Sequence, residues 1–417
     1  MSDSGSSDIN AHHAADSPRR GKSDAEFLAT ATSVINSLES EIQRVRPEER
    51  RRWRALEIGC GSGRLMRPLG RHFLEIHGVD ISGDLIAQAR ERLRDLPAAV
   101  LHLSEGAGVA DLADGSFDFV YSCDFFRHLP DRKLVLDFLR EAHRVLRPGG
   151  LARIECRVAA RTASDQWSSA GFTSQDLLEF AQAHDFQVLA LEGVSTQSMW
   201  TTWRKHASGW REALPAKVEA WGDTRPAAIR RITNASSYEP VAPCRGRFAS
   251  ISLRVENLPP DAGLHHLRVT IGNSLGTVTY VGPLDRNGWQ QIHVDLPELE
   301  ATGLLPVQLF WLDRPLSEPA TLRVIPPGPL VPRLMFAPKR VENRMVSVTL
   351  EEIARPHEIE VSIGGERVED LEKTCTDPRP QRYEVKFRLP DDIGPGLHHL
   401  RISIGRRELA GMPIEIA

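Results

Sequence analysis

The sequence lacks several features that would identify its surroundings. It has no uninterrupted run of about 18 apolar residues, so we expect no membrane-spanning helix and no insertion into a membrane. Its five cysteines are far apart and form no CxxC pair, which argues against a disulfide scaffold and favours a reducing cytoplasm. The formal net charge of -4 supplies no basic field for nucleic acid. We therefore predict a soluble, cytoplasmic protein without a nucleic-acid partner.

The first residues are rich in Ser, Asp, Gly and Ala and lack the basic start and apolar core of a signal peptide. Because this composition buries too little apolar surface to fold alone, we expect residues 1–23 to form a disordered tail. The following segment predicts an amphipathic helix, capped by Asp24 or Ser23. Its apolar residues recur at three- and four-residue steps: Phe27, Leu28, Ala31, Val34, Ile35, Leu38 and Ile42.

From Trp53 to about Lys205, short apolar runs alternate with helical patterns. The runs predict strands at WRALEI, FLEIHGVD, AAVLHL, FDFVYS, GLARIECR and FQVLALEG. The helical patterns are DLIAQARERL, DRKLVLDFLREAHRVL and TSQDLLEFAQAH. Because strands that alternate with helices form βαβ units, this region predicts an α/β fold with a doubly wound, mostly parallel sheet.

The pattern changes after about residue 208. Residues 209–245 have a mixed composition, and we expect them to form a linker. Two series of short strands follow, separated by the hinge PPGPLVP. A strand that ends in Ile-Gly recurs in both series, at LHHLRVTIG, HEIEVSIGG and LHHLRISIG, which favours duplication of one module. We predict two all-β, immunoglobulin-like sandwich domains, residues 246–327 and 333–417.

A glycine-rich loop follows the first predicted strand of the α/β region. The stretch LEIGCGSGRL places Gly59, Gly61 and Gly63 at alternate positions. Such loops bind nucleotides, because amides at a helix start point outward and glycine allows a close approach. The dinucleotide pattern G-x-G-x-x-G is not matched, since Arg64 stands where its last glycine belongs. A phosphate loop ending in G-K-[ST] is absent as well, and an NAD-dependent oxidoreductase stays open as a weaker alternative.

Other motifs follow the glycine loop in a fixed order. Asp80 ends the second predicted strand, where a carboxylate can accept both ribose hydroxyls of an adenosine. The motifs DGSFD, HLPD and RPGG come next along the chain. This combination resembles the class I S-adenosylmethionine-dependent methyltransferases over about residues 53–205. The resemblance implies a Rossmann-like, seven-stranded methyltransferase domain, residues 24–208, with S-adenosyl-L-methionine as its cofactor.

The resemblance also implies which residues contact the methionine and ribose. Glu57 would lie near the amino-acid end, Asp80 would bind the ribose hydroxyls and Ile81 would pack on the adenine. The loop glycines would line the methionine and ribose: Gly59, Gly61 and Gly63. A purely structural role stays open for Glu57 and Ile81.

Further contacts are implied at the adenine amino group and beside the methionine. Glu105 stands where many relatives carry Asp and would meet the amino group, next to the backbone of Gly106 and Ala107. Ser122 and Cys123, at the end of the fourth predicted strand, would border the methionine. A structural role also stays open for Glu105.

Methyl transfer from a sulfonium is an in-line displacement, and the cofactor brings its own leaving group. Positioning can supply much of the catalysis, but a hydroxyl acceptor would profit from a base. Asp124 and His128, in SCDFFRHLPD, are the candidates, and His128 is the predicted catalytic residue because imidazole titrates near neutral pH. Packing against Leu129 and Pro130 is the alternative role of His128.

The acceptor is not named by the sequence. We expect the β-domains to present a saccharide or another hydroxyl compound, to bind a partner or to mediate oligomerisation. Phe125, Phe126, Trp167 and Trp200 could line an acceptor pocket or serve simple packing. No metal site is expected, because neighbouring histidines on a strand point to opposite faces. A non-catalytic scaffold that retains the methyltransferase fold is the alternative function, although the intact glycines with Asp80 favour an enzyme.

Overall fold

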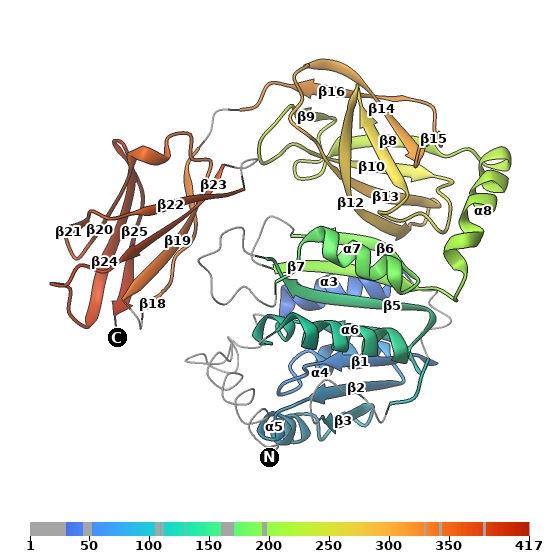
Figure 1. Ribbon diagram of the computed structural model, residues 1–417, viewed down its shortest axis with the longest axis horizontal. Coiled ribbons are helices and arrows are strands. Elements are labelled where there is room, and N and C mark those ends of the chain that lie inside the picture. The colour runs from blue at the N-terminus through green and yellow to red at the C-terminus, as the bar shows by residue number, and fades with distance from the viewer. Residues whose placement is uncertain are drawn as a thin grey trace. The chain divides into compact units, whose positions relative to one another are not determined.

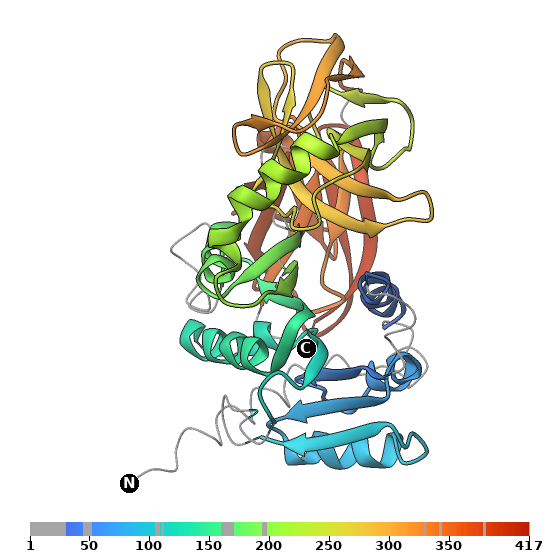
Figure 2. The ribbon, with the colours of Figure 1, turned by 90° about the vertical axis from the view of Figure 1, so that its right-hand side faces the viewer.

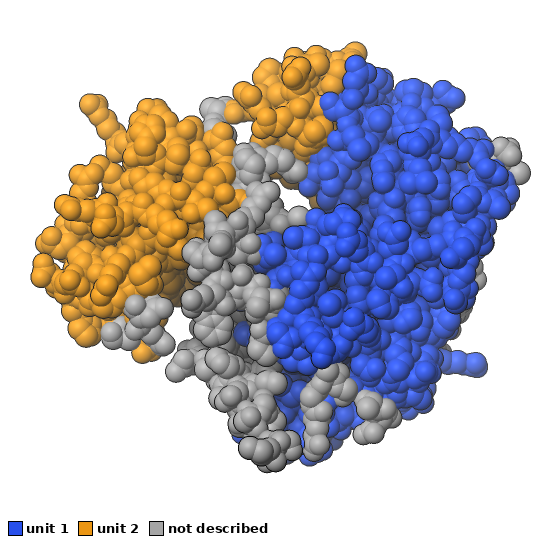
Figure 3. Space-filling view, viewed as in Figure 1, with its two compact units in different colours: residues 1–232, 252–295, 306–321 blue, residues 233–251, 296–305, 322–417 orange. Residues whose placement is uncertain are grey.

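The computed structural model describes residues 31–44, 52–104, 109, 112–129, 131–159, 171–193, 198–328, 331–341, 344–377 and 381–416. The predicted tail, residues 1–23, lies outside these ranges. The chain divides into two compact units (Figure 3). Unit 1 comprises residues 1–232, 252–295 and 306–321, and unit 2 comprises residues 233–251, 296–305 and 322–417. No helix within the described ranges is long and apolar enough to cross a membrane.

Unit 1 contains the α/β part of the chain (Figure 1). Its strands lie in the order β3-β2-β1-β4-β5-β7-β6. They are β1 (Arg54–Ile58), β2 (Glu75–Asp80), β3 (Ala99–Leu103), β4 (Phe117–Ser122), β5 (Leu146–Arg157), β6 (Phe186–Glu192) and β7 (Ser198–Lys205). Strands β1 to β5 pair in parallel, whereas β7 runs antiparallel to β5 and β6. This arrangement confirms the predicted doubly wound, Rossmann-like sheet.

Helices cover both faces of this sheet, with α3 and α6 on opposite sides (Figures 1 and 2). The α-helices in the described part of unit 1 are α3 (Thr32–Ile42), α4 (Met66–Leu69), α5 (Gly83–Arg92), α6 (Arg132–Val145), α7 (Ser174–Ala183) and α8 (Trp210–Thr224). Strand β1 shows how the sequence builds two cores. Leu56 and Ile58 belong to the cluster that contains α6, and Ala55 belongs to the cluster that contains α3. Side chains alternate along a strand, so Glu57 shares the α3 face with Ala55.

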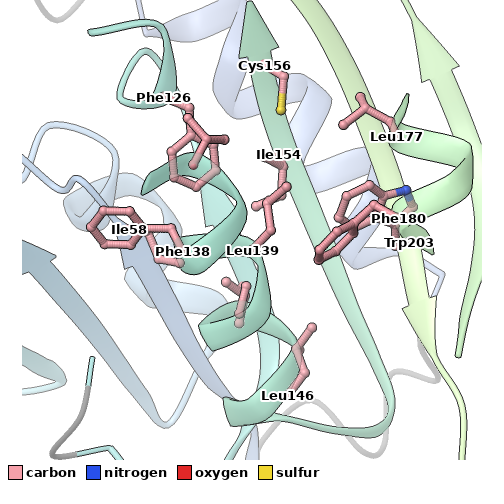
Figure 4. Close-up of a cluster of buried hydrophobic side chains, with 14 of the residues drawn as sticks. Ile58, Phe126, Phe138, Leu139, Leu146, Ile154, Cys156, Leu177, Phe180 and Trp203 are labelled. Atoms are coloured by element: carbon pink, nitrogen blue, oxygen red, sulfur yellow. The ribbon is translucent and has the colours of Figure 1, made fainter. Parts of the chain in front are cut away.

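The core on the α6 face is formed by an amphipathic helix packed on the sheet. Asp131 caps α6, because its carboxylate accepts a hydrogen bond of 2.8 Å from the Leu134 amide. Phe138 and Leu139 lie together with Ile58 and Ile154 in this core (Figure 4). Burial of each large apolar side chain contributes about 1.5–3 kcal/mol. The buried residues of α6 recur at helical spacing: Val135, Phe138, Leu139, Ala142 and Val145.

The sheet of unit 1 does not end at β6. Strand β12 (Ser274–Leu284) pairs with β6 at Tyr280 and Ala190, and β12 also pairs with β11 (Leu267–Ile271) and β13 (Trp289–Asp295). The loop before β11 adds further contacts. The Leu264 amide donates to the Val188 carbonyl at 2.9 Å, and Gln187 Nε2 donates to the Ala262 carbonyl at 2.7 Å. Strand β6 would otherwise be an exposed edge, which β12 covers.

Helix α8 lies in the segment for which the mixed composition predicts a linker. Trp210, Leu214 and Val218 follow one another at four-residue steps and are buried. Trp210 Nε1 also donates to Asp261 Oδ1 at 3.1 Å. The sequence pattern did not predict this helix, because its apolar stripe is narrow and Pro215 lies inside it. The linker prediction for residues 209–245 is thus wrong in part, because α8, β8 (Ala228–Asn234) and β9 (Val241–Pro243) lie there.

The other strands between residues 250 and 325 are β10 (Ser250–Glu256), β14 (Gly303–Trp311), β15 (Arg314–Pro315) and β16 (Ala320–Ile325). Residues of both units occur in β8, β10, β14 and β16. Within unit 1, β14 pairs with β11 along residues 307–311. Within unit 2, β16 pairs in parallel with β9.

The C-terminal part of unit 2 consists of two sheets. One has the order β17-β19-β23-β22, with β17 (Arg333–Phe336), β19 (Met345–Glu351), β22 (Glu372–Asp377) and β23 (Arg382–Arg388). The other has the order β18-β25-β24-β20-β21, with β18 (Arg340–Val341), β20 (Ile359–Ile363), β21 (Glu366–Val368), β24 (Gly396–Ile404) and β25 (Arg407–Ile416). Both sheets contribute to one buried cluster, for example Val348, Val361, Val385 and Leu400. This region is strand-rich as predicted, and its immunoglobulin-like character stays a prediction.

A chain shortened to residues 1–224 tests whether β12 is needed to protect β6. It keeps the strands β1 to β7 but loses β12 and the contacts of residues 260–266. We expect it to associate with itself and to melt at a lower temperature than the full chain, because a bare edge strand pairs with other chains. Light scattering after size-exclusion chromatography and thermal melts would measure this. The control, residues 1–328, should match the full chain, and equal behaviour of residues 1–224 and this control would contradict the expectation.

Candidate functional site

The glycine loop between β1 and α4 has a backbone that suits glycine. Gly59, Gly61 and Gly63 have φ angles of 74°, 53° and 75°, in the left-handed region that other residues rarely adopt. The amides of Gly59 and Cys60 both donate to the Val79 carbonyl, at 2.8 and 3.0 Å. These two hydrogen bonds hold the loop against the end of β2.

The three glycines differ in the space beside them. A Cβ atom on Gly59 would lie 2.2 Å from the Phe125 ring, and one on Gly63 would lie 2.7 Å from Leu93. Beside Gly61, no described heavy atom lies within 4 Å of the corresponding position. Glycine at positions 59 and 63 therefore lets Phe125 and Leu93 pack against the loop. Gly61 borders open space on the side where a Cβ atom would lie.

Asp80 connects the end of β2 to the glycine loop. Its Oδ2 accepts a hydrogen bond of 2.8 Å from the Gly61 amide, and its Oδ1 accepts one of 2.9 Å from the Ser82 amide. The residue is 2% exposed. A carboxylate has about four lone-pair positions, so these bonds leave acceptor capacity on each oxygen. The loop-holding role of Asp80 is one that the sequence pattern did not reveal.

Glu57 lies on β1, next to the loop, and is almost fully buried. The Tyr121 hydroxyl donates to Glu57 Oε2 at 2.9 Å. Burial raises the pKa of Glu57 to about 8, and the negative charge of Asp80 adds to this, while the Tyr121 hydrogen bond and the Arg64 charge oppose it. Glu57 thus holds a proton at neutral pH in the absence of a bound cation.

The end of β4 carries two predicted contact residues with different surroundings. Ser122 is fully buried, and its hydroxyl donates to the Ile58 carbonyl at 2.8 Å, so it links β4 to β1. The Cys123 thiol donates to Glu155 Oε2 at 3.5 Å. Burial raises the pKa of this thiol well above its usual range, and the Glu155 charge adds to the effect. Cys123 therefore stays a thiol and is not suited to act as a nucleophile.

Asp124 and His128 lie close together directly after β4. Asp124 has a φ of 63°, and its amide donates to Glu155 Oε2 at 2.9 Å. His128 ends the short 3-10 helix Phe126–His128, and its Nε2 lies 3.8 Å from Asp124 Oδ1. Glu155, on β5, was missed by the sequence analysis. The sequence did contain a signal for Glu155, because this residue lies near the carboxyl end of β5. The carboxyl ends of neighbouring parallel strands meet at one edge of the sheet, so Glu155 is expected near the end of β4.

The remaining predicted residues are placed as follows. Ile81 comes directly after β2 and is partly exposed. Phe125 and Phe126 are buried around Phe138, with ring centroids 5.2 and 5.9 Å from it, which agrees with the packing alternative. Trp200 is partly buried beneath the Arg153 guanidinium, 5.0 Å from its ring centroid. Several predicted residues lie outside the described residues: Glu105, Gly106, Ala107, Pro130 and Trp167.

Comparisons with known proteins cover the same part of the chain. Residues 56–154 match the family model described as a methyltransferase domain. Phosphoethanolamine N-methyltransferase 2 of Caenorhabditis elegans is 35% identical over 97 residues, which are 23% of this chain and 22% of that protein. A ubiquinone biosynthesis O-methyltransferase of Methylococcus capsulatus is 32% identical over 98 residues, which are 23% of this chain and 40% of that protein. The chain thus spans less than half the length of each of these relatives.

Among solved structures, a SAM-dependent methyltransferase of Methanosarcina mazei is similar, with 18% sequence identity and a TM-score of 0.33. The similarity covers 40% of this chain and 96% of the archaeal chain.

The residues of the site fit a nucleoside with a positively charged amino-acid part. Gly61 borders open space, and two buried carboxyl groups, those of Glu57 and Asp80, flank the glycine loop. The family match covers this loop, β2 and the end of β4. Together they support S-adenosylmethionine as the cofactor of the methyltransferase domain in the N-terminal part of the chain.

The raised pKa of Glu57 predicts how stability depends on pH. With its pKa raised to about 8, Glu57 keeps its proton in the folded protein at neutral pH, whereas the unfolded chain releases it near the ordinary glutamate pKa of 4.5. The free energy of unfolding should therefore fall as the pH rises through this window. The variant Glu57→Gln should lack this contribution, so its stability relative to the wild type should increase between pH 5 and pH 8. Urea unfolding followed by tryptophan fluorescence measures both, and parallel pH profiles would contradict the assignment.

Proposed function

We propose that this protein is an S-adenosylmethionine-dependent methyltransferase that transfers a methyl group to a hydroxyl acceptor by in-line displacement. The observation that carries the proposal is the bond between the Asp80 carboxylate and the Gly61 amide, beside open space. It supports the proposal because a carboxylate that can accept hydrogen bonds from ribose hydroxyls lies next to a loop that a ligand can approach closely.

In this proposal the cofactor lies along the ends of β1, β2 and β4. Asp80 accepts hydrogen bonds from the ribose hydroxyls, and Gly61 lies beneath the ribose and methionine. Glu57 faces the ammonium group, which favours the charged carboxylate, so cofactor binding releases the proton that Glu57 holds. The backbone of Ser122 and Cys123 borders the methionine, since both side chains are engaged within the protein.

The chemistry of the proposed reaction needs little from the protein. The sulfonium of the cofactor supplies the methyl group and its leaving group, and the site aligns the acceptor oxygen with them. We assign His128 as the base that removes the hydroxyl proton, with Asp124 stabilising the imidazolium. Their distance of 3.8 Å is longer than a hydrogen bond, as is common before a substrate binds.

The acceptor that we propose is a saccharide or another hydroxyl compound. The carboxylates of Asp124 and Glu155 and the ring of Trp200 belong to the same sheet edge as His128. Hydroxyl groups donate well to carboxylates, and an aromatic ring packs on the apolar face of a sugar or ring compound. The strands beyond residue 250 would contribute to presenting it.

Titration calorimetry with S-adenosylmethionine tests the cofactor site. We expect Asp80→Ala to weaken binding by about 1.5–3 kcal/mol, the range for a hydrogen bond to a charged group, or roughly 10- to 150-fold in affinity. Asp84→Ala, an exposed position at the start of α5, is the matched control and should bind like the wild type.

Two results would count against the proposal. Absence of binding to the wild type at millimolar cofactor would exclude the enzyme function and favour a scaffold. Equal affinity of Asp80→Ala and the wild type would contradict the proposed position of the ribose, provided that circular dichroism shows both proteins to be folded.

A further inference from the structure

A row of paired residues connects the proposed cofactor site to the strands beyond residue 250. We propose that the β12–β13 hairpin positions helix α3 over the α3 face of the methyltransferase sheet, with Arg44 and Tyr280 as the coupling residues. The hairpin would thereby act as a built-in part of the methyltransferase domain. The positioning of α3 can be tested by hydrogen exchange alone, whereas the expected effect on cofactor dissociation rests on the proposed function.

The row runs straight across the sheet. Residues that pair on neighbouring strands have their side chains on the same face. Glu57 of β1 pairs with Tyr121, and the pairing continues strand by strand as far as β13. Its members after Tyr121 are Arg153, Thr202, Ala190, Tyr280 and His293.

Three pairs of neighbours in this row are joined by direct side-chain contacts. Tyr121 donates to Glu57, and Arg153 Nη1 donates to Thr202 Oγ1 at 2.8 Å. The Tyr280 and His293 rings lie 5.0 Å apart. With the exception of Ala190, the members of the row carry polar groups on one face of the sheet, from the proposed cofactor site to the hairpin.

Helix α3 covers this row. Arg153 Nη2 donates to Ser37 Oγ of the helix at 3.0 Å. Leu38 and Ile42 are fully buried in the same hydrophobic cluster as Tyr121. The position of α3 thus determines how the face that carries Glu57 and Arg153 is closed.

The C-terminal end of α3 is held by the hairpin. Arg44 is 2% exposed in its side chain and forms an ion pair with the equally buried Glu41. Arg44 Nη1 donates to the Val281 carbonyl of β12 at 2.5 Å, and its guanidinium lies 5.1 Å from the centroid of the Tyr280 ring. Arg44 is therefore fixed from two sides by β12, through a backbone acceptor and an aromatic face.

The helix depends on such contacts because it is short. An isolated helix of fewer than about 12–15 residues is marginal in water, and α3 has 11 residues. It also lacks a side-chain cap at its N-terminal end. Loss of the anchor at Arg44 should therefore loosen α3 before it affects helices on the other face.

The test uses the full chain and compares Tyr280→Leu with Tyr280→Phe, which keeps the aromatic face and loses only the hydroxyl. Arg44→Met is a second variant that removes the charge at similar length. Hydrogen exchange of residues 31–44 is the first readout, with α6 as the internal reference on the opposite face. The dissociation rate of S-adenosylhomocysteine, followed by stopped flow, is the second.

We expect exchange in residues 31–44 to be about 30-fold faster in Tyr280→Leu and in Arg44→Met, the size of effect that a desolvated cation–π contact supplies. Tyr280→Phe should match the wild type, and α6 should be unchanged in all variants. S-adenosylhomocysteine should leave the Leu and Met variants several-fold faster.

Two results would overturn the proposal: unchanged exchange of α3 in Tyr280→Leu, and an equal rise in the exchange of α6. A loosened α3 with an unchanged dissociation rate would contradict the coupling of the helix to the cofactor site. If the wild type does not bind S-adenosylhomocysteine, the proposed function fails. The exchange readout then still decides whether the hairpin positions α3.

Discussion

The hydrogen bond from the Gly61 amide to the Asp80 carboxylate joins the two strand ends on which the site depends. The Gly59 and Cys60 amides reinforce it by donating to the Val79 carbonyl, one residue before Asp80. These bonds hold the loop, whose glycines have left-handed φ angles, against β2. Space remains beside Gly61. Asp80 thus has a structural role even without a ligand, and its buried charge is balanced by backbone donors.

The two faces of the sheet bury different kinds of side chain. The α6 face is closed mainly by apolar side chains, which come from the amphipathic helices α6 and α7 and from the sheet. The α3 face buries Glu57, Arg153 and Thr202 as well, and buried polar groups are costly unless they are paired. Their partners come from several elements: Tyr121 from β4, Ser37 from α3 and Glu192 from β6. Helix α3, which lies on this face, meets part of this need through Ser37.

Much of the α/β region could be predicted from the sequence, because its strands are short apolar runs and its helices are regular amphipathic patterns. The strand predicted at FDFVYS coincides with β4, and the helix predicted over 131–146 differs from α6 by one residue at each end. Strand β12 was missed, since SLGTVTYVGPL contains two glycines and a proline and lacks alternation. The contacts of Glu155, Arg153 and Arg44 could not be predicted either, because they join residues far apart in the chain.

In the candidate site, too, the sequence indicated the local motifs but not the contacts between residues far apart in the chain. The glycine loop and Asp80 form a local motif at the ends of adjacent strands, and the sequence indicated both. Which glycine faces open space depends on Phe125 and Leu93, which reach the loop from other elements. The engagement of Ser122 and Cys123 within the protein likewise depends on β1 and β5.

A crystal structure of the chain with S-adenosylhomocysteine tests the central claim most directly. The account predicts ribose hydroxyls within hydrogen-bonding distance of the Asp80 carboxylate, with the ribose beside Gly61 and the ammonium group facing Glu57. A nucleoside bound elsewhere on the chain, or one whose ribose does not contact Asp80, would contradict it.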